Sequence, residues 1–301
     1  MVAYYVGLPT GATIRAGGPD ELRLVPRNAS LVAYANVQAI MVSELRQRLL
    51  AFLPFHGDGQ EEFQDQTGID IETDIDSVVA VFVPPTPPDD DGSRSSGLVL
   101  ARGRFDEERI EALMRERGAV VEDYMGTRLI VGDGRFSVAF PEPGLAALGS
   151  TPVVRQAIEL EDAGDSVLTN DDVMNLVRTM DSGNTWAVGR FDSLTAQAGL
   201  PRDLEVRLPS VIWFTANAHI NGGVRGVLTA EATDEEAAAN ARDVVRGFLA
   251  FANLQTTSRP ELQTLLQAVE LGGTGTSVAL SFDLPSASFD ALFQDRERTP
   301  Q

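Results

Sequence analysis

The chain has 301 residues, 43% of them hydrophobic and 23% charged, which is enough to build one large globular domain or two of ordinary size. Its formal net charge is -20 and all 24 basic residues are arginine, so it lacks the basic surface that nucleic acids and anionic lipids require. It has no cysteine, which excludes disulfides, thiolate metal sites and cysteine nucleophiles.

The first half of the chain predicts an extended lead-in followed by mixed strands and helices. In chain order we expect a strand at 30–37, a helix at 39–53, a short helix at 60–66, strands at 77–83 and 97–105, a helix at 106–117, and three short strands between 119 and 140. The helix at 106–117 has the clearest ends. Asp106 is its predicted N-cap, and Gly118 is predicted to terminate it.

Two bridging helices follow, one opened by Thr151-Pro152 and one by Asn170. The second half then predicts strands at 185–191, 211–220 and 224–232, helices at 234–253 and 261–271, a strand at 276–284 and a terminal helix at 286–294. The run 221–223, Asn-Gly-Gly, predicts a hairpin turn. Thr233 and Glu236 have the spacing of a capping box.

This mixture of hairpins and helices predicts an α+β fold, with two related units of largely antiparallel sheet packed with helices. The predicted organisation is an extended segment at 1–24, a first unit at 25–145, bridging helices at 146–182, a second unit at 183–295 and a tail at 296–301. Both units show the succession strand, strand, strand, helix, so we expect that they arose by internal duplication.

The tetrapeptide Gly-Arg-Phe-Asp occurs twice, at 103–106 and 189–192. Each copy leaves an apolar strand and enters a helix or helical turn, with Asp as the cap. We therefore interpret it as a strand-to-helix joint, used once in each half, in which glycine allows close backbone approach.

One acidic run offers the oxygen ligands that a hard cation prefers. Its carboxylates alternate with isoleucine and are Asp70, Glu72, Asp74 and Asp76. A calcium loop beginning at Asp70 needs glycine at its sixth position and glutamate at its twelfth, which are Ile75 and Val81 here. These carboxylates are therefore weak metal candidates, and a solvated turn before a strand is the favoured interpretation.

Other motifs give no catalytic constellation. The glycine-rich run 272–277 follows a helix and precedes a strand, which is the wrong order for a phosphate loop. Ser166 lies in a Gly-Asp-Ser-Val tetrad typical of one class of hydrolases, but a nucleophilic serine needs a base. The two histidines, His56 and His219, have no evident partner. We expect no cofactor and no catalytic residue, although hydrolysis by a pair of carboxylates stays open.

The runs GLVLARGRFDEERIEALMRERGAVVEDYMGTRLIV and LAALGSTPVVRQAIEL resemble a family of uncharacterised α+β envelope or secreted proteins from acidobacterial and similar bacteria. The resemblance covers about 25–195. It implies an extracytoplasmic, periplasmic location and carries no catalytic residues. Residues 1–8 are too short for a signal-peptide core and lack a basic leading region, so this chain differs from the family pattern there.

These observations favour a non-enzymatic binding or scaffold protein at the bacterial envelope. We expect a membrane-extrinsic subunit of a larger membrane protein complex, of which energy-transducing and photosynthetic complexes are examples, with no span of its own. The predicted partner contacts are the segments 1–15 and 84–96 and the tail 294–301, and the first of them could also touch the membrane. The candidate contact residues are Val2, Tyr4, Tyr5, Val6, Leu8, Pro85, Pro87, Asp89, Asp90 and Asp91. The alternative is a carrier that holds an apolar small molecule between sheet and helices.

Overall fold

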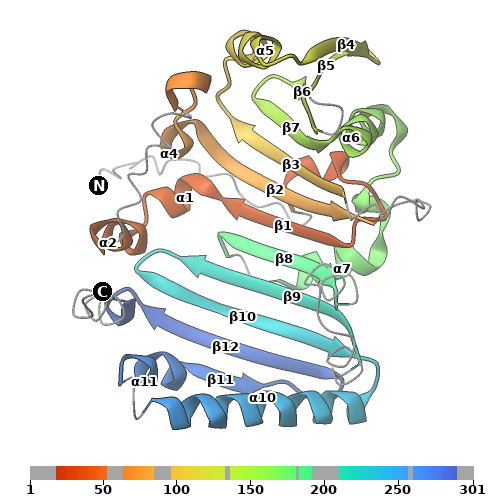
Figure 1. Cartoon of the computed structure of the whole chain (residues 1–301). Helices are drawn as coiled ribbons and strands as arrows, with labels where there is room; N and C mark the ends of the chain where they lie inside the picture. Colours follow the sequence, from red (N-terminus) through yellow and green to blue (C-terminus); the bar gives the residue numbers. More distant parts are fainter. Residues whose placement is uncertain are drawn as a thin grey trace, which may run out of the picture.

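The computed structural model describes residues 18–52, 64–84, 96–132, 136–180, 183–191, 210–256 and 260–289. Within them a single sheet of 12 strands runs through the molecule, with helices packed against it (Figure 1). Every strand pair is antiparallel. The α+β fold with largely antiparallel sheet is therefore confirmed.

The first half of the chain supplies seven strands. Its elements are η1 (Asp20–Leu24), β1 (Leu31–Asn36), α1 (Val37–Met41), α2 (Glu44–Phe52), α4 (Ile71–Asp74), β2 (Ile75–Val83), β3 (Ser96–Gly103), α5 (Glu107–Glu116), β4 (Val120–Tyr124), β5 (Thr127–Val131), β6 (Phe136–Glu142) and β7 (Leu145–Ser150). The remaining elements are α6 (Thr151–Ala163), η2 (Val167–Thr169), α7 (Asp171–Thr179), β8 (Thr185–Arg190), β9 (Val211–Ile220), β10 (Gly223–Ala232), α10 (Glu235–Gln255), α11 (Pro260–Gln267), β11 (Val269–Gly272) and β12 (Ser277–Pro285).

The strand order is β11-β12-β10-β9-β8-β1-β2-β3-β7-β6-β5-β4. β1 and β8 pair at the centre, so the sheet is continuous across the boundary predicted between the two units. Going outward from this pair, β8, β9, β10 and β12 take the places that β1, β2, β3 and β7 take on the other side. Helix α10 follows β10 as α5 follows β3. An internal duplication would produce this topology.

Several elements differ from the sequence-based expectation, among them η1, which is a helical turn within the segment that was expected to be extended. β7 was not predicted, because Leu-Ala-Ala-Leu-Gly-Ser contains no β-branched residue, yet it pairs with both β3 and β6. β11 was predicted as the end of a helix. The helix expected at 39–53 is two helices, because the Ser43 hydroxyl donates to the Ile40 carbonyl at 2.6 Å and accepts from the Arg46 amide at 3.2 Å.

Helix caps follow the predictions in part. Asp106 accepts from the Arg109 amide at 3.0 Å, as expected for the N-cap of α5. At α10 the cap is Asp234, which accepts from the Ala237 amide at 2.7 Å, so the capping box assigned to Thr233 is wrong. Thr151 lies inside α6 and its hydroxyl bonds that of Ser137 at 2.8 Å, so it is not the N-cap either.

The two Gly-Arg-Phe-Asp segments lie at different places in the topology, and Asp192, the predicted cap of the second, lies outside the described residues. Gly103 ends β3, where an added Cβ would lie 2.1 Å from the Asp74 carbonyl oxygen, so glycine serves close backbone approach as predicted. Gly189 lies in β8, the counterpart of β1, and faces the Phe214 ring. The repeat that matches in topology is Asp-Glu-Glu at 106–108 and 234–236, which opens α5 and α10.

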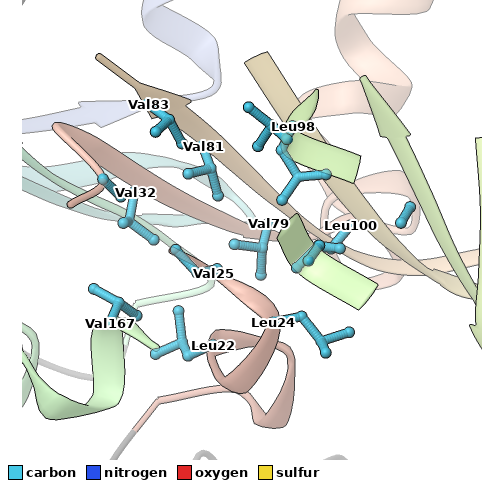
Figure 2. Close-up of a cluster of buried hydrophobic side chains, with 14 of the residues drawn as sticks. Leu22, Leu24, Val25, Val32, Val79, Val81, Val83, Leu98, Leu100 and Val167 are labelled. Carbon is cyan, nitrogen blue, oxygen red and sulfur yellow. The ribbon is translucent and has the colours of Figure 1, made fainter. Parts of the chain in front are cut away.

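The main core lies on one face of the sheet, which we call the core face. Buried side chains of β1, β2, β3 and β7 meet η1, α6, η2 and α7 there. Figure 2 shows Leu22 and Leu24 of η1, with the following Val25, against these strands. On the opposite face, α10 places Ala238 and Ala241 against Ala232 and Val278. The described helices that cover the core face of the first half therefore have no counterpart on that face of the second half, where α10 packs on the opposite face.

Candidate functional site

The described helices do not cover the core face along its whole length. From β1 to β7 its side chains are apolar and buried under the helices. Beyond β8 the same face continues over β9, β10, β12 and β11, and α7 lies at its border. The side chains there become polar and half-buried or exposed.

Two adjoining hollows of about 540 and 270 Å³ lie on this part of the sheet, and we call them together the sheet groove. Both are lined by Asn217 and Val227. The larger hollow is also bordered by His219, Arg225, Glu270, Ser281 and Asp283, and the smaller by Leu176, Met180, Trp213, Thr215, Thr229 and Glu231. Strand alternation places these strand side chains on the core face.

Three half-buried polar side chains form the middle of the groove floor: Thr215, Asn217 and Thr229. Thr215 and Thr229 face each other across β9 and β10. Among the residues that the structure describes, none of these three side chains has a hydrogen-bond partner. A hydroxyl or amide removed from water without a partner is unfavourable, so such groups are available to a bound molecule.

The ionic groups of the groove favour a cationic or polar ligand. Arg225 is paired with Asp283 at 2.7 Å, so neither leaves much net charge. Glu231 accepts from the Thr276 hydroxyl at 3.2 Å, and Glu270 forms no ion pair with any described residue. The two glutamates therefore leave the groove negative. At its border the Arg190 guanidinium lies 5.8 Å from the centre of the Trp213 ring.

A second polar cluster lies inside the core and is structural. Arg102 donates to Glu21 at 2.7 Å and to Glu142 at 2.6 Å, and Arg23 donates to Glu142 at 2.5 Å. Because Arg23 and Glu21 belong to η1, these ion pairs hold η1 against β3 and β6.

The pKa of Glu142 argues against a role as a catalytic acid. Burial opposes its charged form, but hydrogen bonds and charge from Arg102 and Arg23 outweigh burial and lower its pKa below the ordinary 4.5. A general acid needs the opposite shift. Tyr34, which stacks on Trp186 nearby with centroids 5.8 Å apart, has its pKa raised by burial and by the charge of Glu21.

The acidic run forms a short helical turn. Asp70 caps α4 by accepting from the Glu72 amide at 2.9 Å, while Asp74 accepts from the Asp70 amide at 2.9 Å and pairs with Arg104 at 3.0 Å. Glu72 pairs with Arg46, and Asp76 lies in β2. Nowhere in the described ranges do three or more His, Cys, Asp or Glu side chains gather as a metal site would require.

The remaining motifs have local structural roles. Gly273 and Gly275 have positive φ of 96° and 59° in the turn between β11 and β12, so the glycine-rich run is a hairpin turn. The Ser166 hydroxyl caps η2. His219 is exposed at the groove, and His56 lies outside the described residues.

The predicted partner-contact residues, in 1–17 and 85–95, also lie outside the described residues. No helix in the described part of the chain is both long and apolar enough to cross a bilayer.

The groove itself was not predicted. A signal for it exists in β9, where Trp213, Thr215, Asn217 and His219 alternate with apolar residues. Alternation indicates one polar face, but it does not say which face the helices leave open.

Comparison with known proteins gives the fold and no more. No protein-family model matches the chain, and no curated protein matches it. Among solved structures, crystal form III of TP0453 is similar with a TM-score of 0.54 and 9% identity, over 93% of this chain and 99% of that one. Crystal form IV gives 0.51 and 11% over 91% and 95%, and form I gives 0.50 and 10% over 91% and 97%. The whole-chain α+β architecture therefore occurs in an experimentally solved protein.

Proposed function

We propose that this chain is a non-enzymatic binding or scaffold protein of the bacterial envelope, which serves as a membrane-extrinsic subunit of a larger membrane protein complex. The observation that carries the proposal is the sheet groove. It is a half-buried polar floor on a sheet face whose other half is apolar and covered by helices.

The chemistry of the groove indicates the kind of partner. Thr215, Asn217 and Thr229 offer hydroxyl and amide groups to a polar backbone or side chain. Glu231 and Glu270, with the net charge of -20 behind them, favour a basic segment over an acidic one. A polar, basic segment of a partner protein laid across β9, β10 and β12 satisfies both conditions.

The same features disfavour the apolar carrier. A cavity for an apolar small molecule is enclosed and lined mainly by hydrophobic side chains. The sheet groove is open along the sheet and has polar groups at its centre, so it does not provide that environment.

Two neighbouring residues of β10 give a matched test. Val227 lines both hollows, whereas Leu228 is exposed on the opposite face of the same strand. The wild type, V227R and L228R are immobilised and incubated with detergent-solubilised membranes of the source organism, and captured proteins are identified. We expect wild type and L228R to retain one membrane complex, V227R to lose it, and capture to weaken with salt.

The control is the thermal stability of both variants, which must match. If both variants lose the membrane complex, or if neither does, the groove is not the partner-binding site. A wild-type chain that is recovered from membranes free of any other protein contradicts the proposal as a whole.

A further inference from the structure

Helix α10 lies at the β11 edge of the sheet (Figure 1). It presents an apolar face to solvent. Val244, Phe248, Phe251 and Leu254 are 43%, 70%, 61% and 74% exposed. Their spacing of four, three and three residues places them on one side of the helix. A neighbouring side of the helix, with Ala238 and Ala241, packs on the sheet. The sheet therefore covers one apolar side of the helix and leaves another exposed. We call the exposed side, formed by Val244, Phe248, Phe251 and Leu254, the α10 stripe.

Charge is almost absent from the α10 stripe. Residues 247–255 contain no charged side chain, although 23% of the whole chain is charged. In the preceding turn, Arg246 pairs with Asp243 within the helix. Two copies of this acidic protein could therefore approach along this face without opposing unpaired charges.

Gly247 lies in the middle of the stripe, and the packing of the described chain does not explain it. A Cβ added there would have no heavy atom within 4 Å. Glycine within a helix is unfavourable by about 1 kcal/mol relative to alanine. The missing side chain lets another surface approach the helix backbone at this position.

The stripe complements itself. In an antiparallel pair of α10 helices centred on Leu249, Val244 faces Leu254, Gly247 faces Phe251 and Phe248 faces Ala250 of the other copy. Each aromatic ring then meets a small residue, as ridges meet grooves in packed helices. We propose that the partner of the α10 stripe is a second copy of this chain, which forms an isologous dimer through antiparallel α10 helices.

The apolar surface area that the two helices would bury indicates how strong the dimer is. The exposed parts of the two phenylalanines supply about 250 Å² per copy, because an aromatic side chain buries roughly 150–250 Å². With Val244 and Leu254 the pair of copies buries less than the roughly 1,200 Å² typical of a stable complex. The dimer is therefore weak and reversible.

Sedimentation of the full chain over a range of concentrations tests the proposal. We expect a monomer–dimer equilibrium in the wild type and at least about tenfold weaker association for F248E, since a buried aromatic anchor dominates such an interface. The matched control is V42E, because Val42 is also 70% exposed but lies after α1. G247A gives two readouts of opposite sign. We expect a higher melting temperature, because alanine favours the helix, and weaker dimerisation, because its methyl group lies where the partner's ring must pack.

Crosslinking tests the register, because the chain has no native cysteine. With a short bismaleimide, V244C mixed with L254C should crosslink more than either variant alone. A wild type that stays monomeric overturns the proposal, as does a dimer that F248E leaves intact. Binding of the wild type to lipid vesicles, lost in F248E without any dimer, would assign the α10 stripe to a membrane instead. These measurements use the purified chain alone, so they are independent of the groove and its partner.

Discussion

Replacing Arg102 by methionine tests the structural assignment of the buried ion-pair cluster. Arg102 bonds both Glu21 and Glu142, and its side chain is 28% exposed, while that of Glu21 is 8% exposed. In R102M, Glu142 keeps Arg23, but Glu21 loses the cation that neutralises it. The variant therefore leaves a carboxylate inside the protein without an opposite charge.

The expected loss is large. Removing one partner of a buried pair costs about 3–5 kcal/mol, and we expect about 3 kcal/mol because solvent reaches part of the site. A typical domain is stable by only about 5–15 kcal/mol. Urea unfolding followed by tryptophan fluorescence measures the change, since Trp186 is buried beside Tyr34 in the same core.

Two controls isolate the cause. R225M removes an arginine of the same type from the exposed Arg225–Asp283 pair, so its loss should stay below about 1 kcal/mol. Adding E21Q to R102M removes the orphaned charge and should recover part of the stability. A loss below about 1 kcal/mol in R102M, or no recovery in the double variant, would refute the reasoning.

Three further predictions concern the caps, a glycine and the acid response. D106A and D234A should each lower the free energy of unfolding by about 1 kcal/mol, because each aspartate accepts a hydrogen bond from a backbone amide at a helix start. Partner capture should not change. Capture that is lost at unchanged stability would instead indicate a functional site. G189A should cost about 1–3 kcal/mol in a denaturation assay, since its Cβ would lie 2.6 Å from the Phe214 ring, and F214L should relieve the loss. The contribution of Glu142 to the free energy of unfolding should be fully present above its ordinary pKa of 4.5 and be lost as pH falls through its lowered pKa. Unfolding measured from about pH 3 to pH 7 should therefore show that E142Q loses less stability in acid than the wild type does.

Local signals in the sequence predicted most of the helices and strands. Asp106 and Asn170 cap their helices as expected, because N-caps depend on contacts within four residues. The hairpin at 221–223 forms for the same reason. By contrast, β7 and β11 required neighbouring strands to form, since neither segment has enough β-branched residues to indicate a strand by itself.

The functional surfaces were harder to predict than the elements. The predicted contact segments at 1–15, 84–96 and 294–301 came from composition, and nearly all of their residues lie outside the described part of the chain. The sheet groove and the α10 stripe depend instead on which half of each sheet face the helices cover. Alternation in β9 shows a polar face, and the spacing of Phe248 and Phe251 shows an apolar one, but neither pattern says that the surface stays uncovered.

The sequence by itself therefore determined the α+β class, the antiparallel character and the absence of cysteine and lysine chemistry, because these follow from composition and local patterns. Only the tertiary structure decided that one sheet joins the two halves through β1 and β8, and that the described helices cover the core face of the first half but not that of the second. Such pairings join residues more than a hundred positions apart, and their energy comes from burial that no local pattern records. The open groove beside α7 and the uncovered stripe on α10 result directly from that arrangement.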